Sequence, residues 1–285
     1  MEMEIEETWD LEIKPKAGLL DLNLGEVWRY RDLLLLFVKR DFIAQYKQSI
    51  LGPLWHFVQP IFTTAVFLLV FGRIARLPTD GIPSILFYLS GISLWNYFSV
   101  CLTTTSTTFI TNASIFGKVY FPRIIMPLSV ILSNSIRFAI QLSLLAAAIV
   151  WYVVNGYSFH FSVNMLFIPV LFVMLAGIAL GLGIILSALT TKYRDLNILL
   201  TFSIQLIMYA SPVAYSLSYI KNTTIIYFLR LNPLTSILEA FRYCLFGSGT
   251  FTHMDLIYSF CFMVVSIFAG LILFNRIEKT FMDTV

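Results

Sequence analysis

The chain has 285 residues, of which 58% are hydrophobic and only 12% are charged, and its mean hydropathy is +0.82. A soluble domain usually carries about 25% charged residues, so this composition excludes a soluble enzyme with a polar shell and a disordered protein. A formal net charge of +3 over this length also excludes a nucleic-acid-binding protein, which needs a basic surface. We therefore expect a membrane protein.

The N-terminal region divides into two segments. Residues 1–24 are polar and acidic and are predicted to form a cytoplasmic lead; the first ten, MEMEIEETWD, lack the basic n-region of a signal peptide. Residues 25–50 combine an apolar stripe with five basic residues, which is typical of an amphipathic helix in the headgroup plane. The stripe consists of Val27, Tyr30, Leu34, Phe37 and Val38.

Residues 51–285 contain six apolar stretches, each long enough to cross a hydrocarbon core about 30 Å thick. They cover about 53–75, 83–106, 126–153, 164–189, 198–218 and 254–274. Of the Lys and Arg residues, 13 fall on the side of the two termini, five fall on the other side and Arg137 lies within a span. Because basic residues favour the cytoplasm, both termini are predicted to be cytoplasmic.

The outer connection between the fifth and sixth stretches, residues 219–253, is too apolar for an ordinary loop of this length. We expect one or two short helices that dip part-way into the membrane, hinged near Asn232-Pro233 and near Gly247 and Gly249. The predicted fold is thus an all-α membrane protein with six transmembrane helices, an N-terminal amphipathic interface helix and an extracellular re-entrant segment between helices 5 and 6.

Sequence motifs of the common catalytic sites are absent. There is no G-x-x-x-x-G-K-[ST] loop for ATP, no H-E-x-x-H and no G-x-S-x-G. The three cysteines, Cys101, Cys244 and Cys261, lack the paired spacing of a disulfide framework or zinc site, so no metal is expected. The predicted spans hold almost no carboxylate, which disfavours an ion-driven carrier and indicates that a partner supplies the energy.

Two features inside the predicted spans concern packing. Arg137 lies within the third span, where a charge needs a partner or water, so we expect it to face a lumen or a dimer interface rather than lipid. Gly177 and Gly181 form a G-x-x-x-G pair, which permits two helices to approach closely.

Four sequence blocks carry a family resemblance. They are RDFIAQYKQSILGPLWHFVQP (40–60), NASIFGKVYFPRIIMPLSVILSN (112–134), YRDLN (193–197) followed by QLIMYASPVAY (205–215), and LNPLTSILEAFRYCLFG (231–247). In this order, and at this spacing relative to six spans, the chain resembles the permease subunits of the ABC-2 family from about residue 26 to its tail, FNRIEKTFMDTV. The likeness is closer to the members that export O-antigen, capsular or teichoic-acid polysaccharide from bacteria.

The resemblance implies a homodimer in the bacterial inner membrane, bound to two separate ATPase subunits. Those subunits would bind ATP and Mg, whereas this chain would hold no cofactor and would not be an enzyme. The expected function is ATP-driven export of a lipid-linked, O-antigen-like polysaccharide. Alternatives are a teichoic-acid exporter, a small-drug or haem exporter, and a membrane-embedded transferase acting on lipid-linked sugar, although such an enzyme would need clustered His, Asp or Glu.

The family's coupling helix corresponds to the loop after the second span. Phe116, Tyr120 and Phe121 beside Lys118 and Arg123 suit docking into a groove of an ATPase, although an interfacial belt of aromatic and basic residues has the same composition. At the end of the fourth span lie Tyr193, Arg194 and Asp195, which form either a second ATPase contact or a local salt bridge and helix cap.

The basic residues of the predicted interface helix could contact the phosphate of a lipid-linked substrate, because guanidinium groups bind phosphate through two hydrogen bonds. General attraction to anionic lipids explains the same residues at least equally well. The candidates are Arg29, Arg31, Lys39 and Arg40.

A sugar polymer could slide along aromatic rings and hydroxyl groups, because rings accept sugar C–H groups and polar side chains meet sugar hydroxyls. The candidates on the second span and on or near the fifth are Tyr88, Trp95, Tyr97, Phe98, Gln205, Tyr209 and Tyr215. The alternative is that these side chains face lipid or pack in the protein core.

Overall fold

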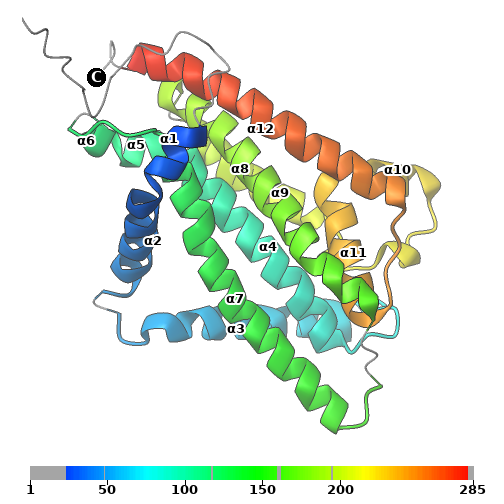
Figure 1. Ribbon diagram of the computed structural model, residues 1–285. Coiled ribbons are helices and arrows are strands. Elements are labelled where there is room, and N and C mark those ends of the chain that lie inside the picture. The colour runs from blue at the N-terminus through cyan, green and yellow to red at the C-terminus, as the bar shows by residue number, and fades with distance from the viewer. Residues whose placement is uncertain (1–23, 48, 117, 159–161, 194, 282–285) are drawn as a thin grey trace, which may run out of the picture.

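The computed structural model describes residues 24–47, 49–116, 118–158, 162–193 and 195–281, and within these ranges the chain forms helices and no strand (Figure 1). The predicted cytoplasmic lead therefore lies almost entirely outside the described residues. Five helical segments of this part of the chain are long and apolar enough to cross a membrane. They are Gly52–Ile74, Ser84–Ser106 (α4), Ile125–Val154 (α7), Val163–Lys192 and His253–Phe274.

Several of these segments are composite. Gly52–Ile74 consists of a 3₁₀ turn, Gly52–Leu54, the helix α3, Trp55–Phe67, and a π-helical turn, Leu68–Ile74. Val163–Lys192 begins with a 3₁₀ turn, Val163–Phe167, and continues as α8, Ile168–Lys192. The last segment belongs to α12, His253–Phe281. The boundaries agree with five of the six predicted spans to within a few residues.

The remaining predicted span, 198–218, is wrong as one continuous helix. Helix α9, Leu196–Tyr209, has 14 residues, and at about 1.5 Å per residue it is about 21 Å long. Turns replace the helix from Ala210 onward, because Pro212 has no backbone N–H to continue the helical hydrogen bonds. The carbonyls of Pro212 and Val213 instead accept hydrogen bonds from a buried side chain, Arg242.

The outer connection contains two short helices and a 3₁₀ turn, Leu217–Tyr219. Helix α10, Thr223–Arg230, begins at Asn222, and α11, Pro233–Phe246, begins at Asn232; each asparagine side chain accepts a hydrogen bond from the first turn of its helix. Gly247 ends α11 at a φ of 72°, a left-handed conformation that glycine adopts without strain. The two ends of α11 therefore coincide with the two predicted hinge positions.

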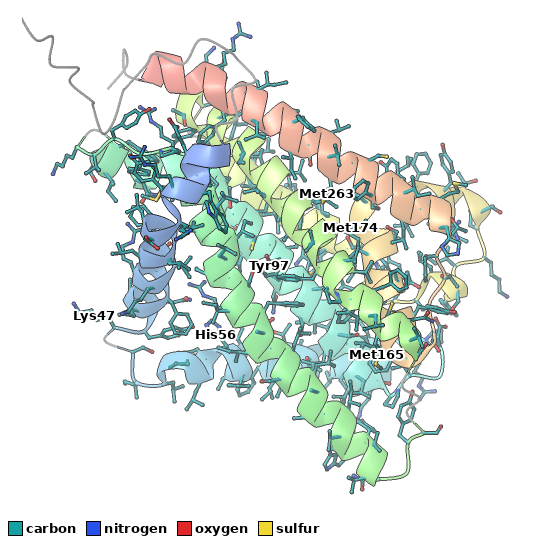
Figure 2. The ribbon with its side chains drawn as sticks, in the orientation of Figure 1. Lys47, His56, Tyr97, Met165, Met174 and Met263 are labelled. Atoms are coloured by element: carbon teal, nitrogen blue, oxygen red, sulfur yellow. The ribbon has the colours of Figure 1, made fainter. Side chains whose placement is uncertain are left out.

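Helices α4 and α8 form the centre of the bundle, and α12 packs along α8 over most of its length (Figure 1). The predicted close approach is confirmed at Gly181, where an added Cβ would lie 2.6 Å from Ser266 Oγ and 2.7 Å from the backbone nitrogen of Ile267. Figure 2 labels Met263 of α12 beside α8, and its sulfur would lie 2.5 Å from a Cβ at Gly177. The glycines thus bring the two helix backbones into contact.

The N-terminal segment forms α1, Leu24–Arg29, and α2, Arg31–Tyr46. Helix α2 lies against α7 (Figure 1). Of the predicted apolar stripe, Phe37 and Val38 are buried, and Phe37 belongs to a hydrophobic cluster against which Tyr30 and Leu34 pack. This cluster joins α2 to one end of the bundle through Phe109, Phe116, Phe121 and Phe274.

Candidate functional site

The loop that follows α4 is held against α8 by hydrogen bonds. It contains two four-residue helices, α5, Thr108–Thr111, and α6, Ala113–Phe116, and the whole connection between α4 and α7 is named the α5–α6 loop. The backbone N–H of Phe109 donates to Ser187 Oγ at 3.4 Å, and Thr190 Oγ1 donates to the carbonyl of Ser106 at 2.6 Å. Because these groups are buried, the start of the loop has a defined position on the end of α8.

The structure divides the five predicted coupling residues of this loop into two groups. Phe116 and Phe121 are buried, with ring centroids 5.8 Å apart, and the Arg123 guanidinium lies 5.6 Å from the Phe116 ring. Lys118 and Tyr120 are exposed, Tyr120 by 50%. The buried residues therefore hold the loop in place, and the exposed residues form its outer surface.

Near the same end of the bundle, α8 leads into α9 through a second exposed segment. Tyr193 is 50% exposed, and the Lys192 ammonium lies 5.2 Å from the centre of its ring. Asp195 is exposed at the N-cap position of α9, but its side chain makes no capping hydrogen bond. Arg194 lies outside the described residues.

The predicted path residues of α4 lie in the core of the subunit. Tyr88, Trp95, Tyr97 and Phe98 are all buried. The Tyr97 hydroxyl is 3.2 Å from Ser135 Oγ, and its ring packs on other aromatic rings of the bundle. In this single subunit these four side chains serve packing.

The predicted path residues of α9 and the following turn lie at the surface. Gln205 is exposed and Tyr209 is 62% exposed. Tyr215 is half-buried, and its hydroxyl donates to the carbonyl of Tyr209 at 3.1 Å.

The four basic residues of α1 and α2 do not converge on one pocket. Arg29, Arg31 and Lys39 are exposed, and Arg40 is half-buried. Arg40 and Arg31 each lie near the aspartate that follows them in α2. The Arg40 guanidinium lies 2.7 Å from Asp41 and 4.6 Å from the centre of the Phe37 ring, and Arg31 lies 3.9 Å from Asp32.

A buried ion pair that the sequence patterns did not predict joins two residues of α11. Arg242 and Glu239 are each 1% exposed, and their side chains are 3.3 Å apart. The Arg242 guanidinium also donates to the carbonyls of Pro212 and Val213 at 2.6 and 3.0 Å. The spacing E-x-x-R on one helix of an otherwise apolar segment was the available signal.

The same pair connects α11 to the turn after α9, to α4 and to the segment that follows α11. The Arg242 guanidinium lies 3.7 Å from the centre of the Phe87 ring on α4, and Glu239 Oε2 accepts a hydrogen bond of 2.8 Å from the backbone N–H of Thr250. Nearby, the hydroxyl groups of Ser216 and Ser218 donate to Asp80. Polar contacts therefore fix the helical hairpin α10–α11 on the bundle.

These features define a multi-pass membrane protein with an ordered loop at one end and a locked helical hairpin at the other. Among the described residues, no group of three or more His, Cys, Asp or Glu side chains is placed to hold a metal ion. The ABC-2 type transporter family matches residues 32–246. The chain belongs to this family.

Three relatives carry the name O-antigen export system permease protein RfbA. One from Klebsiella pneumoniae is 27% identical over 264 residues, which cover 92% of this chain and 96% of the relative. Another from the same species is 28% identical over 261 residues, with the same coverage. A protein from Myxococcus xanthus is 28% identical over 218 residues, 76% of this chain and 81% of the relative. The resemblance to O-antigen export permeases is thereby confirmed, and these relatives are transport subunits rather than enzymes.

Proposed function

We propose that this chain is the permease subunit of an ATP-driven exporter that moves a lipid-linked, O-antigen-like polysaccharide across the bacterial inner membrane. The observation that carries the proposal is the similarity to O-antigen export permeases over 92% of the chain. The chain has no P-loop of its own, so the proposal includes two separate ABC ATPase subunits that bind ATP and Mg. A second copy of the chain completes the complex.

The proposed topology has six crossings and two cytoplasmic termini. Helix α9 and the turn after it form the fifth crossing, and the hairpin α10–α11 enters the outer half of the membrane without crossing it. The nearly complete burial of α11 between α4, α8 and α12 supports this placement, because an ordinary outer loop would be solvated. The positive-inside bias supports the orientation.

The ATPase contact is proposed at the exposed side of the α5–α6 loop. Lys118 and Tyr120 supply a cation and an aromatic ring next to the exposed Val119, and the exposed Tyr193 and Asp195 extend the surface. Gln205 and Tyr209 on the exposed side of α9 are proposed to face the glycan, in a path completed by the second copy. Aromatic rings and amides suit a polymer that must slide.

Two experiments test the proposal. The tagged protein is purified in mild detergent from its native membranes, and the co-purifying proteins are identified by mass spectrometry; we expect a stoichiometric subunit with a P-loop. Separately, the gene is deleted and surface glycan is measured; we expect loss of display and accumulation of the lipid-linked glycan inside the cell. A protein that purifies alone as a dimer, or a deletion strain with normal surface glycan, would contradict the proposal.

A further inference from the structure

A polar cavity lies in the membrane-spanning part of the bundle, and the proposed function does not use it. Its volume is about 180 Å³, and it is bounded by the end of α2, the start of α3, the middle of α4 and α7. The side chains that matter here are His56, Gln59, Asn96, Asn134, Arg137 and Gln141. Figure 2 labels His56 and Tyr97, which lie beside the middle of α7.

The cavity is positively charged. Arg137 carries the one formal charge among the side chains that line it in the described structure, and none of these is a carboxylate. Carboxamides supply most of the other polar groups. The Asp41 carboxylate interacts electrostatically with Arg137, but it is already paired with Arg40 at 2.7 Å. The cavity therefore favours an anion.

The hydrogen bonds within the cavity are incomplete. One Nη of Arg137 donates to Asn134 Oδ1 at 2.8 Å, and the Tyr46 phenol, which also contacts His56, lies close enough to interact with the guanidinium. Arg137 Nε and Gln141 Oε1 are buried and have no hydrogen-bond partner among the described residues. A guanidinium in a membrane span is unfavourable unless a partner or water completes its contacts.

The depth and openings of the cavity restrict what can enter. Arg137 is in the thirteenth position of α7, counted from Ile125, so it lies about 18 Å along the helix from that end. Gln45 and Gln59 line the cavity and are exposed in the subunit, which leaves the cavity open toward the surroundings of the helices. An amphipathic lipid can bring an anionic group to this depth, because its acyl or isoprenoid chain stays in the hydrocarbon core.

We propose that this cavity binds the phosphate group of a membrane lipid. The guanidinium of Arg137 would pair with two phosphate oxygens, and the amide N–H groups of Asn96 and Gln141 would complete the contacts. A water molecule takes about 30 Å³, so a cavity of 180 Å³ has room for a phosphate. The lipid is either an isoprenoid phosphate or a bilayer phospholipid. An isoprenoid phosphate would be the glycan carrier, and this assignment rests on the proposed function.

The test uses the full-length permease as it purifies, with its ATPase partner. Binding of farnesyl phosphate and of dihexanoyl phosphatidic acid is titrated, with farnesol and dihexanoylglycerol as controls that lack the phosphate. We expect the wild type to bind each phosphate lipid more tightly than its control. Arg137→Gln should reduce this preference by about 10- to 100-fold, the range for a hydrogen bond to a charged group.

A second variant separates ligand binding from a purely structural role of Arg137. Gln141→Glu places a carboxylate inside the cavity beside the guanidinium, so the protein should fold with an unchanged or higher melting temperature and still lose its preference for phosphate lipids. Thr223→Glu adds the same charge at the exposed start of α10 and should bind as the wild type does. A preference for farnesyl phosphate alone identifies an isoprenoid carrier, and equal binding of both lipids identifies a general lipid-phosphate site.

Three results would overturn the inference. They are a wild type that does not distinguish phosphate lipids from their controls, a folded Gln141→Glu variant that binds them as tightly as the wild type, and a Gln141→Glu variant that unfolds. Surface glycan is measured in the same strains. A wild type that exports glycan but does not prefer phosphate lipids would disprove only the proposed lipid-phosphate site. A wild type that binds phosphate lipids but has no ATPase partner would disprove only the proposed function.

Discussion

At the scale of single residues, the contacts of Arg242 determine how the outer hairpin is held. Its guanidinium meets a carboxylate on its own helix, two backbone carbonyls of the turn after α9 and an aromatic face on α4. A buried charge is costly unless such partners replace its water. Loss of the guanidinium would leave Glu239 buried without its counter-charge.

We therefore predict that Arg242→Gln destabilises the protein by about 3–5 kcal/mol, the usual cost of breaking a buried ion pair by removing one partner. Thermal unfolding of the purified protein in detergent would measure this. The matched control is Arg230→Gln, because Arg230 lies 3.6 Å from Asp255 and is 36% exposed; this change should cost at most about 1 kcal/mol. Equal losses for the two variants would contradict the role given to Arg242.

At the scale of helices, the glycines of α8 determine how closely α12 can pack. An added Cβ at Gly181 would meet the backbone of Ser266 and Ile267 at 2.7 Å, and backbone atoms cannot move aside as the end of a side chain can. Between membrane helices, close packing of this kind replaces the hydrophobic driving force that is missing in lipid.

Gly181→Ala should accordingly destabilise the protein by about 1–3 kcal/mol, the usual cost of overpacking. Gly25→Ala is the control, since a Cβ at Gly25 of α1 meets nothing within 4 Å. That change should be neutral or stabilise α1 by up to about 1 kcal/mol. Melting temperatures of the two variants measured in one detergent would decide the point, and a Gly181→Ala variant as stable as the wild type would refute it.

In the α5–α6 loop, substitutions of exposed and of buried residues should affect different properties: ATPase binding for the former and stability for the latter. Tyr120→Asp places a charge on the exposed surface proposed for the ATPase contact, and we expect it to weaken ATPase binding by about tenfold, or about 1.4 kcal/mol, without lowering the melting temperature. Phe116→Asp should instead lower the melting temperature, because the Phe116 ring is buried. Co-purification of the ATPase and thermal unfolding measure the two effects.

Tyr219→Asp provides the control for the loop, since Tyr219 is 57% exposed and lies in the outer connection. It should retain both ATPase binding and stability. If Tyr120→Asp also binds the ATPase normally, the docking surface lies elsewhere.

At the scale of the whole molecule, the proposed orientation places the α5–α6 loop in the cytoplasm and α10 outside. Among the native cysteines, Cys101 and Cys244 are buried and Cys261 is exposed. A Cys261→Ser background therefore allows single cysteines to be introduced at exposed positions. Suitable changes are Lys118→Cys, after α6, and Lys221→Cys, before α10, because both lysines are exposed.

A membrane-impermeant maleimide applied to spheroplasts should label Lys221→Cys and leave Lys118→Cys unlabelled until the membrane is opened. The expected contrast follows from the distribution of Lys and Arg across the loops. Labelling of the Lys118→Cys variant alone would show the opposite orientation, and labelling of both variants in intact spheroplasts would rule out a single fixed orientation.

The sequence by itself determined the positions of the five membrane-length helices that the structure describes. Runs of about 20 apolar residues locate five membrane-length helices, and local signals locate the hinges, because an asparagine cap or a left-handed glycine acts on the neighbouring backbone. The G-x-x-x-G pair also predicted close packing correctly. The family could be identified because the order and spacing of short blocks survive in the linear sequence.

Only the tertiary structure decided which side chains face inward. Lipid is as apolar as a protein core, so composition alone could not separate the buried Phe116 and Tyr88 from the exposed Tyr120 and Tyr209. Local sequence patterns also could not identify the partners of Arg242 and Arg137. The Arg242 guanidinium donates to the carbonyl of Pro212, which is 30 positions away in the chain, and the Arg137 guanidinium interacts with Tyr46 at the end of α2. Those contacts exist only once distant helices pack together.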